Sequence, residues 1–137
     1  MKSNELILVL EDDRVDALAL THAFRDAGVT NSMHICASSK DALAYLLRDD
    51  VPLPGLILLD LNLPGMSGLD FLRHIKGEAA WRRIPVIVLT TSNEERDRHQ
   101  AFDLSAAGYI VKPMNYDAFV DMIRAVASYW LLNESPN

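Results

Sequence analysis

Residues 6–13, Leu6-Ile7-Leu8-Val9-Leu10-Glu11-Asp12-Asp13, join an unbroken apolar run to three consecutive acids. Continuous runs of Leu, Ile and Val are typical of strands buried on both faces, as in a parallel sheet covered by helices. The same arrangement, an apolar run followed by a polar residue, recurs at Asp60, Thr90 and Lys112. This stretch therefore predicts an α/β protein that carries its functional groups at the ends of its strands.

Five candidate strands alternate with five candidate helices along the chain. The expected strands span residues 5–10, 33–37, 55–60, 85–90 and 108–112. The expected helices span residues 14–27, 39–49, 67–77, 94–105 and 115–132. Strand–helix repeats with right-handed crossovers give an open, doubly wound sheet, which binds ligands at the carboxyl ends of its strands. We therefore expect the polar clusters to meet at one edge.

The last two helices differ in their apolar content. Residues 94–100 are all polar or charged, so only Ala101, Phe102 and Leu104 remain to anchor the fourth helix. Few apolar contacts imply low local stability, which mobile switch elements share. The fifth helix has a broad apolar face, made of Phe119, Met122, Ile123, Val126, Ala127 and Trp130.

Length and composition indicate a single globular domain. The chain has 137 residues and a net charge of -6, which argues against direct nucleic-acid binding and against an anionic membrane surface. Its lone cysteine, Cys36, forms no intrachain disulfide and fits a cytoplasmic setting as a buried residue. No apolar stretch is long enough to span a bilayer, and no targeting pattern is visible.

The strand-end acids are suited to a hard divalent cation, which prefers oxygen ligands. Asp12 and Asp60 are expected as direct ligands, Glu11 as a ligand through water, and the backbone carbonyl of Asn62 as a fourth contributor. Asp13 is expected to cap the first helix instead.

Asp60 is the sharpest candidate, because a carboxylate among apolar residues is costly unless it is paired or metal-bound. Carboxylates can act as nucleophiles that form acyl phosphates. The alternative is an acid that only caps the turn before Pro64. Lys112 favours the functional interpretation, since a lysine at the end of a buried strand needs a partner and can bind a phosphoryl oxygen. Thr90 offers a hydroxyl, and Pro113 makes the Lys112–Pro113 bond a candidate cis peptide.

Four motifs in this order resemble the receiver domain of two-component response regulators, across essentially the whole chain. They are Leu8-Val9-Leu10-Glu11-Asp12-Asp13, Asp60-Leu61-Asn62-Leu63-Pro64-Gly65-Met66-Ser67-Gly68, Pro85-Val86-Ile87-Val88-Leu89-Thr90 and Gly108-Tyr109-Ile110-Val111-Lys112-Pro113. The resemblance implies a flavodoxin-like (βα)5 fold with five parallel strands in the order 2-1-3-4-5. It also implies one receiver domain over residues 1–137 without an output domain, and a flexible tail at 133–137.

The resemblance further implies a signalling phosphoacceptor that catalyses only its own phosphorylation and dephosphorylation. Asp60 would accept a phosphoryl group from a sensor histidine kinase, with Mg²⁺ at Glu11, Asp12, Asp60 and the Asn62 carbonyl; Mn²⁺ or Ca²⁺ can substitute in crystals. Thr90 and Tyr109 would move together on phosphorylation, with Lys112 on the phosphoryl group, and remodel the face of helix 4, strand 5 and helix 5. Asn62 and Ser92 would tune dephosphorylation.

Shorter motifs resemble the single-domain regulators that partner bacterial phytochromes: Leu61-Asn62-Leu63-Pro64, Arg83-Ile84-Pro85, Thr91-Ser92 and Tyr129-Trp130-Leu131. This implies a light-sensing kinase as donor and a homodimer through helix 4, strand 5, helix 5 and the C-terminal residues. The dimer candidates are Tyr129, Trp130 and Leu132, of which Trp130 is expected in the core.

Two other classes compete with this interpretation. A haloacid-dehalogenase-like phosphohydrolase also uses an aspartate and Mg²⁺ on a parallel sheet, but it carries a second aspartate two residues on, where this chain has Asn62. A flavin-binding electron carrier needs a phosphate loop after the first strand, where the acids Glu11, Asp12 and Asp13 would repel the phosphate.

Overall fold

A computed structural model describes residues 5–132, with side chains described through residue 130. The expected tail at 133–137 lies outside the described residues. The strands are β1 (Ile7–Leu10), β2 (Met33–Cys36), β3 (Leu56–Leu59), β4 (Val86–Thr90) and β5 (Gly108–Val111). The helices are α1 (Arg14–Asp26), α2 (Ser39–Leu46), α3 (Gly68–Gly77), α4 (Glu95–Asp103) and α5 (Tyr116–Leu132).

The five strands form one parallel sheet in the order β2-β1-β3-β4-β5. This confirms the expected flavodoxin-like architecture. Every residue of β1, β3 and β4 is buried, in keeping with their unbroken apolar sequences, whereas the edge strands β2 and β5 are partly exposed. The order reverses between β1 and β3, which places the switch point of the sheet beside the ends of these two strands.

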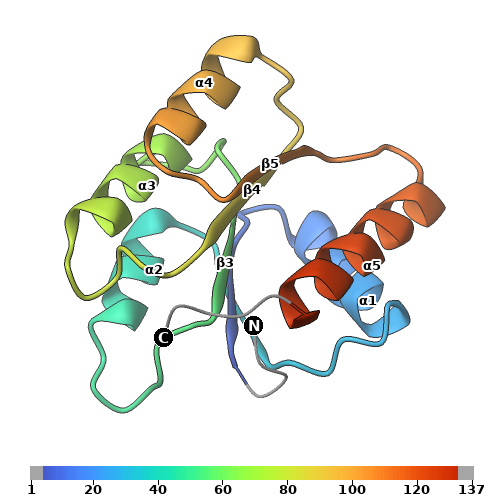
Figure 1. The fold of residues 1–137 in the computed structure, drawn as a ribbon, viewed down its shortest axis with the longest axis horizontal. Helices are drawn as coiled ribbons and strands as arrows, with labels where there is room; N and C mark the ends of the chain where they lie inside the picture. Colours follow the sequence, from blue (N-terminus) through green and yellow to red (C-terminus); the bar gives the residue numbers. More distant parts are fainter. Residues whose placement is uncertain (1–4, 133–137) are drawn as a thin grey trace.

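Helices cover both faces of the sheet (Figure 1), with α2, α3 and α4 on one side and α1 and α5 on the other. The alternating side chains of the strands supply both cores. Leu8, Leu10 and Ile57 join the core beneath α2 and α3, while Ile7 and Val9 join the core beneath α1 and α5.

Helix α4 is the least buried helix that the structure describes, as its sequence predicts. Ala101 is its one buried residue, and Leu104 just beyond it is partly buried. The expectation that Phe102 also anchors the helix is wrong, because its side chain is 49% exposed. Neighbouring positions on a helix point about 100° apart, so Phe102 cannot share the inward direction of Ala101.

Helix α5 packs through Phe119, Ile123 and Ala127, which are buried as expected. Trp130 is partly buried and packs against the same core, whereas Tyr129 is 61% exposed. The side chain of Leu132 lies outside the described residues. Within residues 5–132, no helix is both long and apolar enough to cross a membrane.

Candidate functional site

Backbone hydrogen bonds carry the parallel ladder one residue beyond the strands and so fix the polar residues that follow them. The Glu11 amide donates to the Cys36 carbonyl at 3.0 Å, and the Asp60 amide donates to the Leu10 carbonyl at 3.1 Å. The Lys112 amide donates to the Thr90 carbonyl at 2.8 Å. All of them lie at the carboxyl edge of the sheet, as the sequence predicts. This edge therefore brings one group of polar side chains together: the acids Glu11, Asp12 and Asp60, the Thr90 hydroxyl and the Lys112 ammonium.

Asp60 is buried at the centre of this group. Its Oδ1 atom accepts hydrogen bonds from the Thr90 hydroxyl at 3.0 Å and from the Asn62 amide at 3.2 Å. Gly68 at the start of α3 packs against the backbone of Asp60 and Leu61, where any Cβ atom would collide. Two donors therefore fix Oδ1 of Asp60, and the close packing of Gly68 fixes the backbone of Asp60. Thr90, the hydroxyl partner, is fully buried.

Three carboxylates form a candidate metal centre. Glu11, Asp12 and Asp60 each offer an oxygen, and these oxygens lie within 4.8 Å of one another. Glu11 and Asp60 are buried while Asp12 is exposed, so the cluster opens to solvent on one side. A few carboxylates with an open side suit Mg²⁺, which keeps several waters and a phosphate oxygen in its octahedron. The residues thus fit the ion that the sequence predicts.

Lys112 reaches into the acids from the end of β5. Its Nζ atom pairs most closely with Glu11 and lies 3.7 Å from Asp60 Oδ2 and 3.6 Å from Asp16 Oδ2. The sequence predicted the Asp60 contact but not Glu11 as the nearer partner, and it missed Asp16 at this site. Asp16 lies in the first turn of α1, and no sequence pattern indicated that this turn faces Lys112.

Burial and charge shift the pKa values of this pair. Burial alone would lower the pKa of Lys112, but the hydrogen bond and charge of Glu11, with Asp60 and Asp16, outweigh it and hold that pKa above its usual value. Burial raises the pKa of Glu11, and the charge of Asp60 adds to the rise, against the opposing effect of Lys112. The Lys112 ammonium faces the three acids Glu11, Asp60 and Asp16, which raise its pKa. Lys112 therefore stays charged at neutral pH.

The structure tests two further expectations, the helix cap at Asp13 and the cis bond at Lys112–Pro113. Asp13 caps α1 as expected, since its Oδ1 accepts from the amides of Val15 at 2.9 Å and Asp16 at 3.0 Å. The candidate cis bond is not found: no cis peptide occurs in the described residues, so Lys112–Pro113 is trans. Trans is the more stable isomer of an ordinary bond before proline, by about 0.5 to 1 kcal/mol.

Thr90 also connects the site to the loop before α4. The Ser92 amide donates to the Thr90 hydroxyl oxygen at 3.3 Å, and the Tyr109 hydroxyl donates to the Ser92 carbonyl at 3.0 Å. The guanidinium of Arg98 in α4 lies 5.7 Å from the centre of the Tyr109 ring. The three residues that were expected to modulate the site, Thr90, Ser92 and Tyr109, are therefore joined in one chain of contacts.

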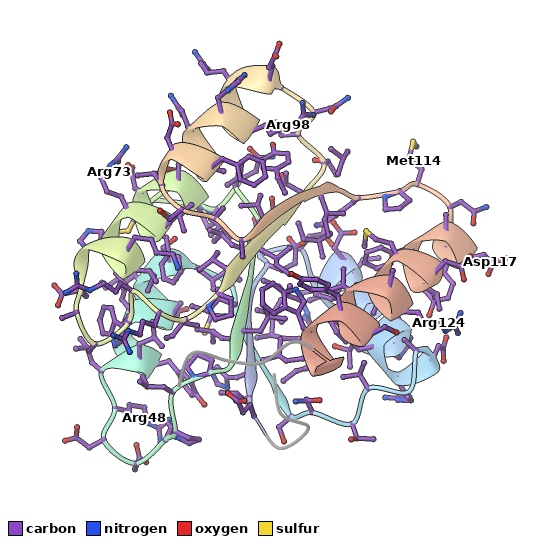
Figure 2. All side chains as sticks on the ribbon, in the orientation of Figure 1. Arg48, Arg73, Arg98, Met114, Asp117 and Arg124 are labelled. Carbon is purple, nitrogen blue, oxygen red and sulfur yellow. The ribbon has the colours of Figure 1, made fainter. Side chains whose placement is uncertain are left out.

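A cavity of about 160 Å³ lies beside the acids, between α1, the loop after β5 and α5. Glu11, Asp16 and Lys112 line its polar end, and apolar residues such as Leu20 and Phe119 line the rest. Met114, at the rim, is fully exposed and extends outward from the loop between β5 and α5 (Figure 2). Apolar surface is thus exposed at the rim of the cavity that Glu11, Asp16 and Lys112 line.

Two curated proteins are similar to this chain over nearly its whole length. The chain is 34% identical over 135 residues to the probable methanogenesis regulatory protein FilR2 of Methanothrix harundinacea, covering 96% of this chain and 87% of FilR2. It is 33% identical over 131 residues to the response regulator Rcp1 of Synechocystis, covering 93% and 89%.

Two solved structures share the whole fold. The phosphorylated cyanobacterial phytochrome response regulator RcpA gives a TM-score of 0.91 at 31% identity, covering 98% of this chain and 99% of RcpA. Mn²⁺-bound Rcp1 gives 0.89 at 32% identity, covering 97% and 99%. A model of the response regulator receiver domain matches residues 7–124. The chain therefore belongs to the family of response regulator receiver domains.

Proposed function

We propose that this protein is a response regulator in which Asp60 accepts a phosphoryl group from a sensor histidine kinase, in a Mg²⁺-dependent reaction. The observation that carries the proposal is the surroundings of Asp60: a buried carboxylate within 3.0 Å of the Thr90 hydroxyl and 3.7 Å of the Lys112 ammonium, beside two further acids. Because the domain is a signalling phosphoacceptor, the outcome of this reaction is the phosphorylated protein itself, and no external substrate is turned over.

In the proposed reaction, an Asp60 oxygen forms a bond to phosphorus while the bond from phosphorus to the histidine nitrogen breaks. Lys112 and Thr90 donate hydrogen bonds to the phosphoryl oxygens. When bound at Glu11, Asp12, Asp60 and the Asn62 carbonyl, Mg²⁺ supplies positive charge that offsets the charge of the phosphoryl group. The metal in the structure of Rcp1 supports a divalent ion in this role.

The donor is proposed to be a light-sensing kinase of the phytochrome class, acting in the cytoplasm. Support comes from RcpA, which is a phytochrome response regulator and matches nearly the whole chain. The exposed apolar surface around Met114, next to the cavity at Lys112, offers an area for the donor to approach Asp60.

The output is proposed to follow from movement of Thr90 toward the phosphoryl group. Tyr109 would follow, because Ser92 bonds to both residues. Asn62 and Ser92, next to Asp60 and Thr90, are proposed to tune the lifetime of the phosphorylated state.

We also propose a homodimer through α4, β5, α5 and the C-terminal residues. Each of the three elements carries an exposed apolar side chain, namely Phe102, Val111 and Tyr129. Trp130 is a weaker candidate because it is partly buried, and Leu132 remains a candidate from sequence. Glutamate at Tyr129 or at Leu132 is expected to shift the protein toward monomer in sedimentation velocity. An unchanged mass in both variants would remove the dimer proposal.

The main test is phosphorylation by acetyl phosphate with Mg²⁺, followed by intact-mass analysis. The wild type is expected to gain one phosphoryl group, and chelation of the metal is expected to prevent it. Asp60→Asn should gain none. Asp13→Asn is the matched control, because it removes a nearby acid while asparagine still caps α1.

Phosphoryl uptake by Asp60→Asn at the wild-type rate would overturn the assignment. Steady turnover of phosphate esters would instead favour a phosphohydrolase. For the donor, phosphotransfer from a phytochrome kinase should outpace transfer from an unrelated histidine kinase, and equal rates would contradict the phytochrome link.

A further inference from the structure

Ser92 is held at each of its polar atoms. Its amide donates to the Thr90 hydroxyl oxygen at 3.3 Å and its carbonyl accepts from Tyr109 at 3.0 Å. Its own hydroxyl donates to Asp97 Oδ2 in the first turn of α4, at 2.6 Å. The first two contacts belong to the expected switch, whereas the third involves an acid that has no other role at the site.

The Ser92–Asp97 bond has the properties of a strong contact. Its length of 2.6 Å lies in the range of charge-assisted bonds from a hydroxyl to a carboxylate, which are about twice as strong as neutral ones. Both side chains are half-buried, so water competes less than at an exposed pair. Since a serine hydroxyl has one proton, Ser92 cannot donate to a phosphoryl oxygen or to water while this bond lasts.

A second contact reinforces the same connection. Arg98 in α4 donates to Asn93 Oδ1 at 2.8 Å. Glu94, at the N-cap position of α4, forms no side-chain capping bond. The loop at 91–94 and the first turn of α4 are therefore joined by side chains of Ser92, Asn93, Asp97 and Arg98, and the direction of the Ser92 hydroxyl depends on α4.

We propose that Asp97 is a positioning residue that directs the Ser92 hydroxyl toward α4, away from Asp60, and thereby lengthens the life of the phosphorylated state. The inference rests on the proposed function. In the hydrolysis that it slows, a water oxygen bonds to phosphorus as the bond from phosphorus to the Asp60 oxygen breaks. The electron pair of that bond stays on Asp60, which returns as a carboxylate, and both water hydrogens leave on dihydrogen phosphate.

Release of Ser92 from Asp97 frees a hydroxyl next to Thr90, where it can donate to the phosphoryl group or orient the attacking water. Asp97→Ala is expected to speed the loss of phosphate by about threefold to tenfold, the size of effect that one added hydrogen bond gives. Asp97→Asn retains an acceptor oxygen and should restore a rate near the wild type. In the Ser92→Ala background, Asp97→Ala should change nothing.

The experiment follows the decay of phosphorylated protein by intact mass after acetyl phosphate is removed. Glu95→Ala is the matched control, because it removes an acid from the same turn of α4 and so makes a similar change at the helix N-terminus. Urea denaturation of each variant monitors folding.

Three results would overturn the inference: an unchanged or slower decay in Asp97→Ala, the same acceleration in Glu95→Ala, or an acceleration that persists without Ser92. The last two would assign the effect to charge or to helix stability. The failure of the proposed function is distinct, since the wild type would then take up no phosphoryl group at Asp60.

Discussion

Helices α4 and α5 flank the same strand, β5, yet they are attached in different ways. Helix α5 buries Phe119, Val120, Ile123 and Ala127, whereas α4 buries Ala101 alone. Polar contacts also tie α5 to α1: the Tyr116 hydroxyl donates to Asp26 at 3.0 Å, and Arg124 donates to the Asp26 carbonyl at 3.4 Å. In α4 the corresponding side-chain bonds run to the loop at 91–94, which itself touches Thr90.

This difference fits the proposed function, in which α5 belongs to the scaffold and α4 to the switch. Apolar burial holds an element in place whatever the state of the site, because it depends only on contact with the core. Hydrogen bonds to a loop depend on where that loop lies, and one of them can be lost if another partner replaces it. In the proposed mechanism, a change at Asp60 would therefore pass to α4 through Thr90 and Ser92, while α1 and α5 would keep the sheet intact.

The largest expected effect is on global stability. Ile123→Ala in α5 removes a side chain that is 1% exposed, and should lower the free energy of unfolding by about 2 to 5 kcal/mol. Phe102→Ala in α4 removes a larger side chain that is 49% exposed, and should cost far less. Urea denaturation of both variants measures the two values, and equal losses would break the comparison.

The second expected effect is on local opening. Amide hydrogen exchange in α4 should proceed through opening events of much lower free energy than exchange in α5, since local stability follows buried apolar contact. Exchange measured by NMR in native conditions reports both helices in one sample. If the amides of α4 were protected to the level of global unfolding, α4 would be part of the scaffold and not a switch.

The sequence was sufficient to predict the elements and the site because both follow from short-range patterns. Strand burial comes from unbroken apolar runs, and parallel strands bring their carboxyl ends together, so Glu11, Asp60, Thr90 and Lys112 could be grouped in advance. The sparse burial of α4 was also predictable, since it depends on composition over one segment.

Contacts that depend on how elements are rotated were not predictable. Asp16 lies near Lys112 and Asp97 bonds to Ser92 because of the rotation of α1 and α4 about their axes. Phe102 was expected inside because apolar side chains favour burial, but adjacent helix positions diverge and Ala101 took the inward place. Such choices are made by packing between elements, which a single sequence does not specify.

A smaller effect on stability and on the phosphorylation response is expected from removing a tyrosine hydroxyl. Tyr109 bonds to the loop before α4, and Tyr116 bonds α5 to α1. Tyr109→Phe removes the donor to the Ser92 carbonyl and should lower stability by about 1 kcal/mol. It should also change the response of α4 amide chemical shifts to phosphorylation. Tyr116→Phe removes the donor to Asp26 at the exposed α1–α5 contact, and should leave that response unchanged. Equal responses in both variants would contradict the separation of the two sides.

The smallest expected effect is the ionisation of Tyr116. Partial loss of water contact raises its pKa above the usual value near 10, and the hydrogen bond to Asp26 with the charge of that carboxylate raises it further. Because the pKa of Tyr116 is higher in the folded protein than in the unfolded chain, its contribution to stability is fully present below the unfolded pKa. That contribution is lost as the pH rises through the folded pKa. Tyrosinate absorbance during alkaline titration should therefore lose a late-ionising component in Tyr116→Phe. The same component should persist in Asp60→Asn, because the α1–α5 contact is expected to be independent of the phosphorylation site.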